Sequence, residues 1–209
     1  MDATSTHATR ARLQRRALWL EYGTIAWNVG EAFLTIGLGI AAGSLALIGF
    51  GTDSIVEVMA SAVVVWHIRP GHEVDHPERT RLALRLVAGA FAALAIVLAT
   101  FAIRDLVTGR EAGESLFGIG YMTMTAVVMF GLAIAKRRLA SELNSAPLRS
   151  EAAMTFLDGV LSTLTLIGLA LNAFAGLGWA DPLAALVVSI AAANEARENW
   201  AEAGEELEG

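Results

Sequence analysis

Two acidic residues, Asp53 and Glu57, stand in a stretch that is otherwise apolar, from Ser44 to Ser61. They are four residues apart, so on a helix their carboxylates lie one above the other on a single face. An Asp at the centre of a membrane helix costs roughly 2.5–3.5 kcal/mol on insertion scales. Two carboxylates on one such face indicate that a positive species, either a metal ion or protons, binds or passes there.

Polar residues interrupt two further apolar segments at helical spacing. Asn28 and Glu31 are three residues apart and share one face of a helix. Met154 and Asp158 are four residues apart and do the same. At a rise of ~1.5 Å per residue, Glu31, Asp53 and Asp158 each lie roughly 14–21 Å from one end of their segment, near the middle of a bilayer. Carboxylates that converge from three helices on an interior cavity can coordinate a divalent cation through oxygen.

Each of these residues also has a structural interpretation. The carboxylates of the second and fifth segments can be protonated groups that hydrogen-bond between helices. Asn28 and Glu31 can likewise be structural residues that hydrogen-bond between helices. A single methionine in a membrane span usually packs against its neighbours, so Met154 is either a packing residue or a soft ligand. The sequence leaves both interpretations open.

The composition is that of an integral membrane protein. The chain has 209 residues, 55% of them hydrophobic, and its charged residues gather at the two ends and between apolar segments. The absence of cysteine excludes a disulfide framework, a thiolate metal site and thiol catalysis. No basic stretch interleaved with aromatic residues indicates nucleic acid. We expect a protein that works in the lipid bilayer and is not an enzyme.

Six apolar segments predict an all-α membrane protein with six transmembrane helices. Asp181 followed by Pro182 is a helix-start signal, because Asp caps the helix and Pro suits its first position. The domain plan is a tail at residues 1–16, a six-helix domain at 17–196 and a short acidic tail at 197–209. The predicted spans are residues 17–42, 44–66, 81–103, 115–135, 148–171 and 181–196.

Lysine and arginine residues predict the orientation of the spans, because they are enriched in cytoplasmic loops. With the N-terminus inside, 13 of the 15 Lys and Arg residues fall on the cytosolic side, and only Arg104 and Arg110 fall outside. The N- and C-termini are then both cytosolic, and the membrane is the plasma or inner membrane of the cell. This topology puts Lys136 in a basic loop and Glu21 near a water-accessible end of the first span.

The second helical segment resembles one of the motifs of the cation diffusion facilitator family. The run that ends in Asp53-Ser-Ile-Val-Glu57 is similar to the family's second helix. There an acidic residue or His, followed after three residues by Asp, makes half of the transport site. The resemblance implies that Asp53 and Glu57 are ligands of a transported ion.

The fifth and sixth segments carry the rest of the resemblance. Leu148-Arg-Ser-Glu151-Ala, with Met154 and Asp158 after it, is similar to the fifth helix, where L-R-x-D-A is usually followed by His-x-x-x-Asp. The start of the last segment, Asp181-Pro-Leu-Ala-Ala-Leu, resembles the sixth helix. The resemblance implies a six-helix transmembrane bundle, Asp158 as a third ligand, proton-coupled export of a divalent cation, and a homodimer.

The chain departs from the family pattern in three places. Met154 stands where the family usually has His, and Glu57 stands where it usually has Asp. Only residues 197–209 follow the last span, where the family usually has a cytoplasmic domain. The pattern is therefore nearest to the small transporters of this kind that consist of the membrane domain alone.

The ligand types bear on the ion. An Asp/Glu/Asp site without His is a harder donor set than Zn²⁺ usually meets, which admits Mn²⁺, Fe²⁺, Co²⁺ or Ni²⁺ beside Zn²⁺. Glu31, Asn28 or water can complete the shell if Met154 does not bind. We expect Zn²⁺ as the transported ion and no permanently bound cofactor. Metal binding needs deprotonated ligands, so the ion and protons compete for the same oxygens.

A loop between the second and third spans holds His72, Asp75 and His76, which are candidate ligands of a secondary cytosolic metal site. The two histidines are four residues apart, a spacing that suits a metal on a helix. Pro70 and Pro77 flank them, however, so a solvated polar turn is the alternative.

Two other functions compete with ion export. A non-transporting scaffold or accessory subunit with the same fold would have no use for the insertion cost of Asp53 and Asp158. A transporter of organic cations would need an aromatic-lined cavity. Only Trp27 and Phe156 stand near the carboxylates in the sequence.

Overall fold

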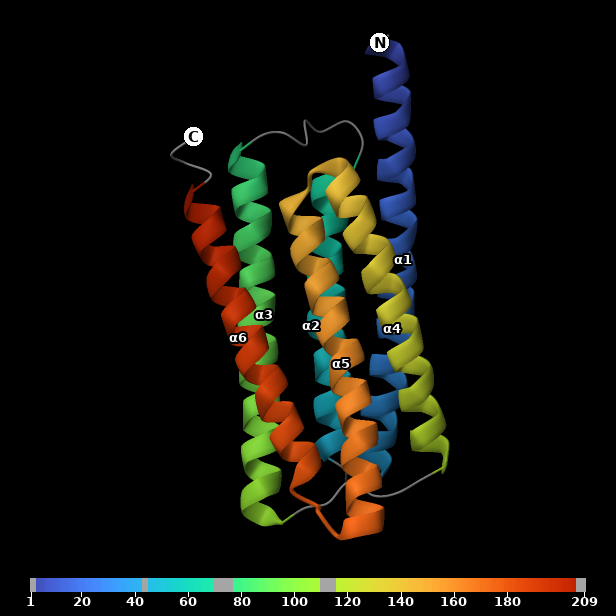
Figure 1. The fold of residues 1–209 in the computed structure, drawn as a ribbon, viewed down its shortest axis with the longest axis vertical. Helices are drawn as coiled ribbons and strands as arrows, with labels where there is room; N and C mark the ends of the chain where they lie inside the picture. Colours follow the sequence, from blue (N-terminus) through green and yellow to red (C-terminus); the bar gives the residue numbers. More distant parts are fainter. Residues whose placement is uncertain (1–2, 43–44, 70–76, 110–115, 206–209) are drawn as a thin grey trace.

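The computed structural model describes residues 3–42, 45–69, 77–109 and 116–205, and this part of the chain forms six α-helices and no β-strand. They are α1 (Ala3–Ala42), α2 (Leu45–Ile68), α3 (Pro77–Thr108), α4 (Leu116–Leu143), α5 (Ala146–Ala175) and α6 (Ala180–Glu205). The helices lie side by side along one long axis, and both termini lie at the same end of the bundle (Figure 1). We call this the terminal end and the opposite one the far end. The prediction of an all-α architecture with six helices is confirmed.

The six helices divide into a group of four and a pair. Helix α1 packs on α2 and α4, and α5 packs on α4 and α2, so these four helices surround a common interior. Helices α3 and α6 pack on each other, and the pair contacts the group of four through α2 and α5 (Figure 1). The predicted ligands that the structure describes lie on α1, α2 and α5, within the group of four.

Small and polar residues let α3 and α6 approach closely. Ala95 and Ala192 are buried in one hydrophobic cluster with Val188. The Ser189 hydroxyl of α6 donates a 2.9 Å hydrogen bond to the Ala95 carbonyl of α3. Small side chains and hydrogen bonds between helices are typical of packing inside membranes, where the hydrophobic effect does not drive helices together.

Large apolar side chains cover much of the outer surface. Phe33, Val127 and Ile190 are 79%, 69% and 63% exposed on three different helices. In a bilayer such a surface contacts the apolar lipid tails, whereas in water it would leave a large apolar area exposed to solvent. By length and hydropathy alone, two stretches of the described chain could cross a membrane: Gly51–Ile68, with mean hydropathy 1.2, and Pro77–Thr108, with 2.5.

Three helices extend further toward the terminal end than the predicted spans. Helix α1 begins at Ala3 rather than Ala17, α4 continues past Lys136 to Leu143, and α6 runs to Glu205. The extensions contain Ala, Arg, Leu and Glu, which are strong helix formers, and no proline. Hydropathy marks where the apolar segment ends, but the helix itself continues into charged residues.

The connection between α4 and α5 is a turn of two residues, Asn144 and Ser145. Asn144 has φ 50°, in the left-handed region that Asn tolerates at a helix end. The Ser145 N–H donates to the Ala140 carbonyl at 3.0 Å, and the Leu148 N–H donates to the Ser145 hydroxyl at 3.5 Å. The basic loop predicted to begin at Lys136 is therefore wrong, because these caps end one helix and start the next within two residues.

Candidate cation site

Three acidic residues from two helices lie in the interior of the group of four. Asp53 and Glu57 on α2 and Asp158 on α5 are buried, with exposed fractions of 8%, 3% and 8%. Asp158 interacts electrostatically with Glu57 and with Asp53, and Asp53 interacts with Glu57. The fold thus brings together the acidic residues of the second and fifth helical segments.

These carboxylates do not yet form a closed coordination shell. In the part of the chain that the structure describes, no group of three or more His, Asp or Glu side chains is arranged so that it could hold a metal ion. An ion bound among Asp53, Glu57 and Asp158 would therefore require these side chains to converge, or water to complete its shell.

Two of the three carboxylates each leave one oxygen unpaired. Oε1 of Glu57 and Oδ2 of Asp158 are buried and accept no hydrogen bond from any described residue. The buried hydroxyl of Ser162, one turn after Asp158, also lacks a partner within the described chain. An unsatisfied buried polar group costs about 1–3 kcal/mol. A bound cation or a proton would satisfy the two carboxylate oxygens.

Glu31 differs because neighbouring side chains occupy both of its oxygens. The Tyr121 hydroxyl of α4 donates to Oε1 at 2.6 Å, and the Ser54 hydroxyl of α2 donates to Oε2 at 3.1 Å. Glu31 also interacts electrostatically with Asp53 and Asp158. It links three helices, which favours the structural interpretation of this residue over a ligand role.

The two neutral candidates have different surroundings. Asn28 is buried and close to Glu57; its amide N–H donates to the Thr24 carbonyl at 3.1 Å, while its Oδ1 has no hydrogen-bond partner in the described chain. That carbonyl oxygen is free to contact an ion. Met154 instead packs in the hydrophobic cluster that contains Phe91, which favours its packing role.

A second polar cluster, centred on Lys136, was missed by the sequence reasoning. The predictions that Lys136 lies in a loop and that Glu21 lies near water are wrong, because both side chains are fully buried. The Lys136 Nζ lies 2.6 and 2.8 Å from the two carboxylate oxygens of Glu151 and 3.4 Å from Oε2 of Glu21. We call this cluster the lysine cage; Ser61 and Thr155 complete it.

The sequence did contain a signal for the burial of Lys136. Met129, Ala133, Lys136 and Ala140 are spaced four, three and four residues apart, and all four are buried on one face of α4. The next residue, Arg137, is exposed. Helical spacing, rather than the run of three basic residues, indicates which of these side chains turns inward.

The loop candidates cannot be placed in this way. His72, Asp75 and His76 lie outside the described residues. The secondary metal site predicted there stays a prediction.

Comparison with known proteins shows the family of the chain. Residues 24–207 match the cation efflux transmembrane domain, a stretch that covers most of the chain and includes all three interior carboxylates. The chain is also 22% identical to Transmembrane protein 163 of Xenopus laevis over 148 aligned residues. The aligned region covers 71% of this chain and 53% of that protein. The chain thus spans about half the length of this curated relative. It belongs to the cation efflux family, also called cation diffusion facilitators, which is a family of multi-pass membrane transporters of cations and not of enzymes.

Proposed function

We propose that this protein exports a divalent metal ion in exchange for protons by alternating access, and that Zn²⁺ is the first ion to test. Family membership supports a cation as the substrate and a membrane as the place of action. The observation that carries the proposal is the pair of buried oxygens, Glu57 Oε1 and Asp158 Oδ2, that lack a hydrogen-bond partner in the described chain. A divalent cation between the two helices would pair both.

Proton exchange follows from the chemistry of the same oxygens. A carboxylate binds a metal ion only when it is deprotonated, so protons and the ion compete for Asp53, Glu57 and Asp158. The three groups are within electrostatic reach of one another, so neutralising one changes the affinity of the others. Protons that enter from the outer side would then displace an ion that was loaded from the inner side.

The donor atoms bear on the choice of ion. The described site offers carboxylate oxygens and the Asn28 carbonyl, while Met154 packs in the hydrophobic cluster. Oxygen donors suit Mn²⁺, Fe²⁺, Co²⁺ or Ni²⁺ as well as Zn²⁺. Zn²⁺ comes first because of the family resemblance, and the other four ions are the alternatives.

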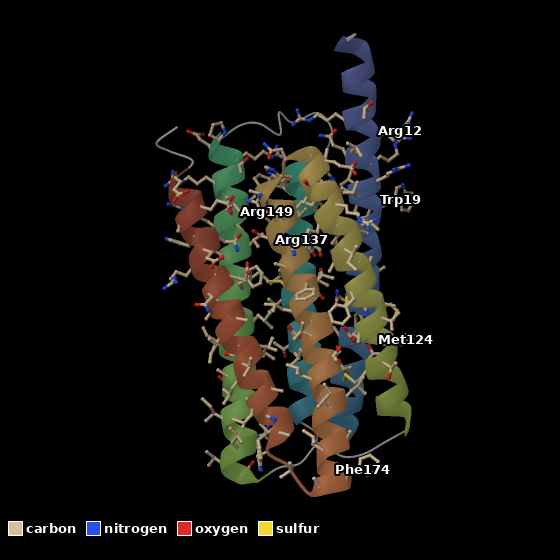
Figure 2. The ribbon with its side chains drawn as sticks, viewed as in Figure 1. Arg12, Trp19, Met124, Arg137, Arg149 and Phe174 are labelled. Carbon is tan, nitrogen blue, oxygen red and sulfur yellow. The ribbon has the colours of Figure 1, made fainter. Side chains whose placement is uncertain are left out.

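The orientation and assembly form part of the proposal. Arg12, Arg137 and Arg149 lie in the half of the bundle nearer the terminal end, whereas Met124 and Phe174 lie toward the far end (Figure 2). Because Lys and Arg are enriched on the cytoplasmic side, the terminal end faces the cytosol of a plasma or inner membrane. By family resemblance the working unit is a homodimer.

A scaffold or accessory subunit with the same fold is the competing function. The hydrogen bonds of Glu31 support a structural use of an acidic residue in this bundle, since two hydroxyls donate to its oxygens. The unpaired oxygens of Glu57 and Asp158 have no such structural use.

The sequence from His72 to His76 matches the H-E-x-x-H motif of zinc hydrolases, which the sequence reasoning overlooked. The family of the chain is one of transporters, so we do not propose a hydrolase.

The test is Zn²⁺ movement in proteoliposomes with an imposed pH gradient. We expect the intact protein to move Zn²⁺ against the direction of proton flow, and Asp158→Asn to reduce this flux to the level of empty liposomes. The amide keeps the size of the side chain and removes its charge. Mn²⁺, Fe²⁺, Co²⁺ and Ni²⁺ are tested in the same vesicles.

Asp105→Asn is the matched control, because it makes the same chemical change near the far end of α3, where Asp105 lies 3.7 Å from Arg104. We expect it to keep the wild-type flux. If no divalent ion moves through the intact protein, the scaffold is the better account. Flux that ignores the pH gradient would exclude proton exchange while leaving metal transport in place.

A further inference from the structure

The only lysine of the chain, Lys136, is fully buried among four helices. Its ammonium on α4 donates to both oxygens of Glu151 at 2.6 and 2.8 Å and to the Thr155 hydroxyl at 3.2 Å, both on α5. Oε2 of Glu21 on α1 lies 3.4 Å away, and the Ser61 hydroxyl of α2 donates to Glu151 at 2.8 Å. The lysine cage is thus a cation of α4 in contact with oxygens of α1 and α5, with a hydroxyl of α2 hydrogen-bonded to Glu151.

The lysine cage brings two acidic side chains, Glu21 and Glu151, to one ammonium. Glu21 is fully buried; its Oε2 lies 3.4 Å from the ammonium, and its Oε1 has no hydrogen-bond partner within the described chain. A buried ion pair is already a weak source of stability, because desolvation offsets much of the attraction. A second carboxylate, with one oxygen 3.4 Å from the ammonium and the other without a partner in the described chain, adds to that cost.

The type of the cationic residue inside the lysine cage also supports a comparison with a metal site. A lysine ammonium is a compact point charge, whereas the guanidinium of arginine is a planar fork. Every other Lys or Arg position of the chain holds arginine, and the one lysine stands inside the oxygen cage. The cage therefore surrounds a compact cation, as a metal site does.

The lysine cage lies between the three interior carboxylates and the terminal end. On α5, Glu151 precedes Asp158 by seven residues, which is about 10 Å of helix. On α2, Ser61 follows Glu57 by four residues, toward the same end. Glu57 interacts electrostatically with both Lys136 and Glu151, so a change of charge in the lysine cage affects the interior carboxylates.

We propose that Glu21 and Glu151 form a second cation site on the ion path, and that Lys136 is a tethered cation that occupies it until a divalent ion displaces the ammonium. The proposal rests on the proposed function, because it needs an ion that travels between the terminal end and Asp158. It assigns the lysine cage as the first oxygen site that an ion meets from that end. The ammonium then keeps the path closed whenever no ion is passing.

The first test counts bound Zn²⁺ per purified chain by equilibrium dialysis and elemental analysis. Lys136→Met removes the ammonium at nearly constant length, so the vacated cage should bind one more Zn²⁺ per chain than the wild type. The double variant Lys136→Met/Glu151→Gln should lose that additional ion. Arg138→Met is the matched control, because it removes one exposed positive charge from the same helix and should leave the count unchanged.

An unchanged count in a Lys136→Met protein that elutes as the wild type does from a sizing column would overturn the proposal. If that variant does not fold, Lys136→Gln, whose amide can still donate to Glu151, takes its place under the same criterion. If the wild type binds no Zn²⁺ while Lys136→Met binds one through Glu151, then the site at Asp158 fails and the cage stands. The two failures are therefore distinguishable.

A second measurement uses the wild-type protein. Because Lys136 is the only lysine, acylation at this side chain can be followed by mass spectrometry without any substitution. A displaced ammonium leaves its two carboxylates, so the acylation rate should rise several-fold at saturating Zn²⁺. A rate that does not change while Zn²⁺ binds would show that Lys136 is a fixed structural ion pair.

Discussion

Glu31 and Glu57 are both buried glutamates in the group of four, yet their hydrogen bonding differs. Hydroxyls of Tyr121 and Ser54 occupy both oxygens of Glu31, whereas Oε1 of Glu57 has no partner in the described chain. We therefore interpret Glu31 as a residue that ties helices together and propose that Glu57 is available to an ion. Burial alone does not distinguish the two roles.

We therefore expect Glu31→Gln and Glu57→Gln to have opposite effects. Glu31→Gln loses one of two acceptors and should lower the free energy of unfolding by about 1–3 kcal/mol, with little change in Zn²⁺ affinity. Glu57→Gln should abolish Zn²⁺ binding with little loss of stability. Thermal unfolding in detergent and isothermal titration measure the two quantities, and loss of Zn²⁺ binding in Glu31→Gln would make that residue a ligand.

At this scale the sequence predicted well where spacing carried the information. The separation of Asp53, Glu57 and Asp158 along their helices, with the depth of each, placed them in one buried region. Spacing could not show that a hydroxyl from α4 would reach Glu31, or that Lys136, which helical spacing places on an inward face, would meet Glu151 there. Those outcomes depend on which faces of distant helices meet, and this is a property of the packed bundle.

Helices α1 and α2 approach each other closely at Gly51. A Cβ built there would stand 2.4 Å from Cγ1 of Ile36 and 2.6 Å from Oγ1 of Thr35, so only glycine fits without movement. The same two helices carry Glu31 and Asp53. Their close contact therefore sets the distance between these two acidic residues.

Gly51→Ala tests this contact. The added methyl group should force α1 and α2 apart, lower the free energy of unfolding by about 1–3 kcal/mol and weaken Zn²⁺ binding. Gly89→Ala on α3 is the matched control, because nothing lies within 4 Å of the Cβ it would add. Removing a helical glycine there should be neutral or stabilise by up to about 1 kcal/mol. Equal thermal stability of the two variants would contradict the close approach.

For the whole molecule, the number and order of the helices could be predicted from apolar segments, and the helix ends could not. Hydropathy falls where charged residues begin, but helices such as α1 and α6 continue through them because strong helix formers follow. The division into a group of four and the pair of α3 and α6 was also beyond the sequence. It depends on which surfaces match in shape, as the hydrogen bond from Ser189 to Ala95 illustrates.

The orientation of the bundle can be tested because the chain has no cysteine. Thr108→Cys places a thiol at the far end, and Ser141→Cys places one at the terminal end; both positions are exposed. A membrane-impermeant maleimide applied to intact cells should label Thr108→Cys alone, and Ser141→Cys should react only after the cells are opened. The reverse pattern would mean that the terminal end faces outward.

The two-residue turn at Asn144 and Ser145 has a mechanical consequence. Because this connection is so short, we expect α4 and α5 to tilt together as one rigid unit. Lys136, Glu151 and Asp158 all lie on these two helices, so we expect their backbone positions to stay nearly fixed relative to one another, while their side chains can still separate. For the ion path that we propose, opening would then occur where α4 and α5 meet α1 and α2, between Asp158 and Asp53 and between Glu151 and Glu21.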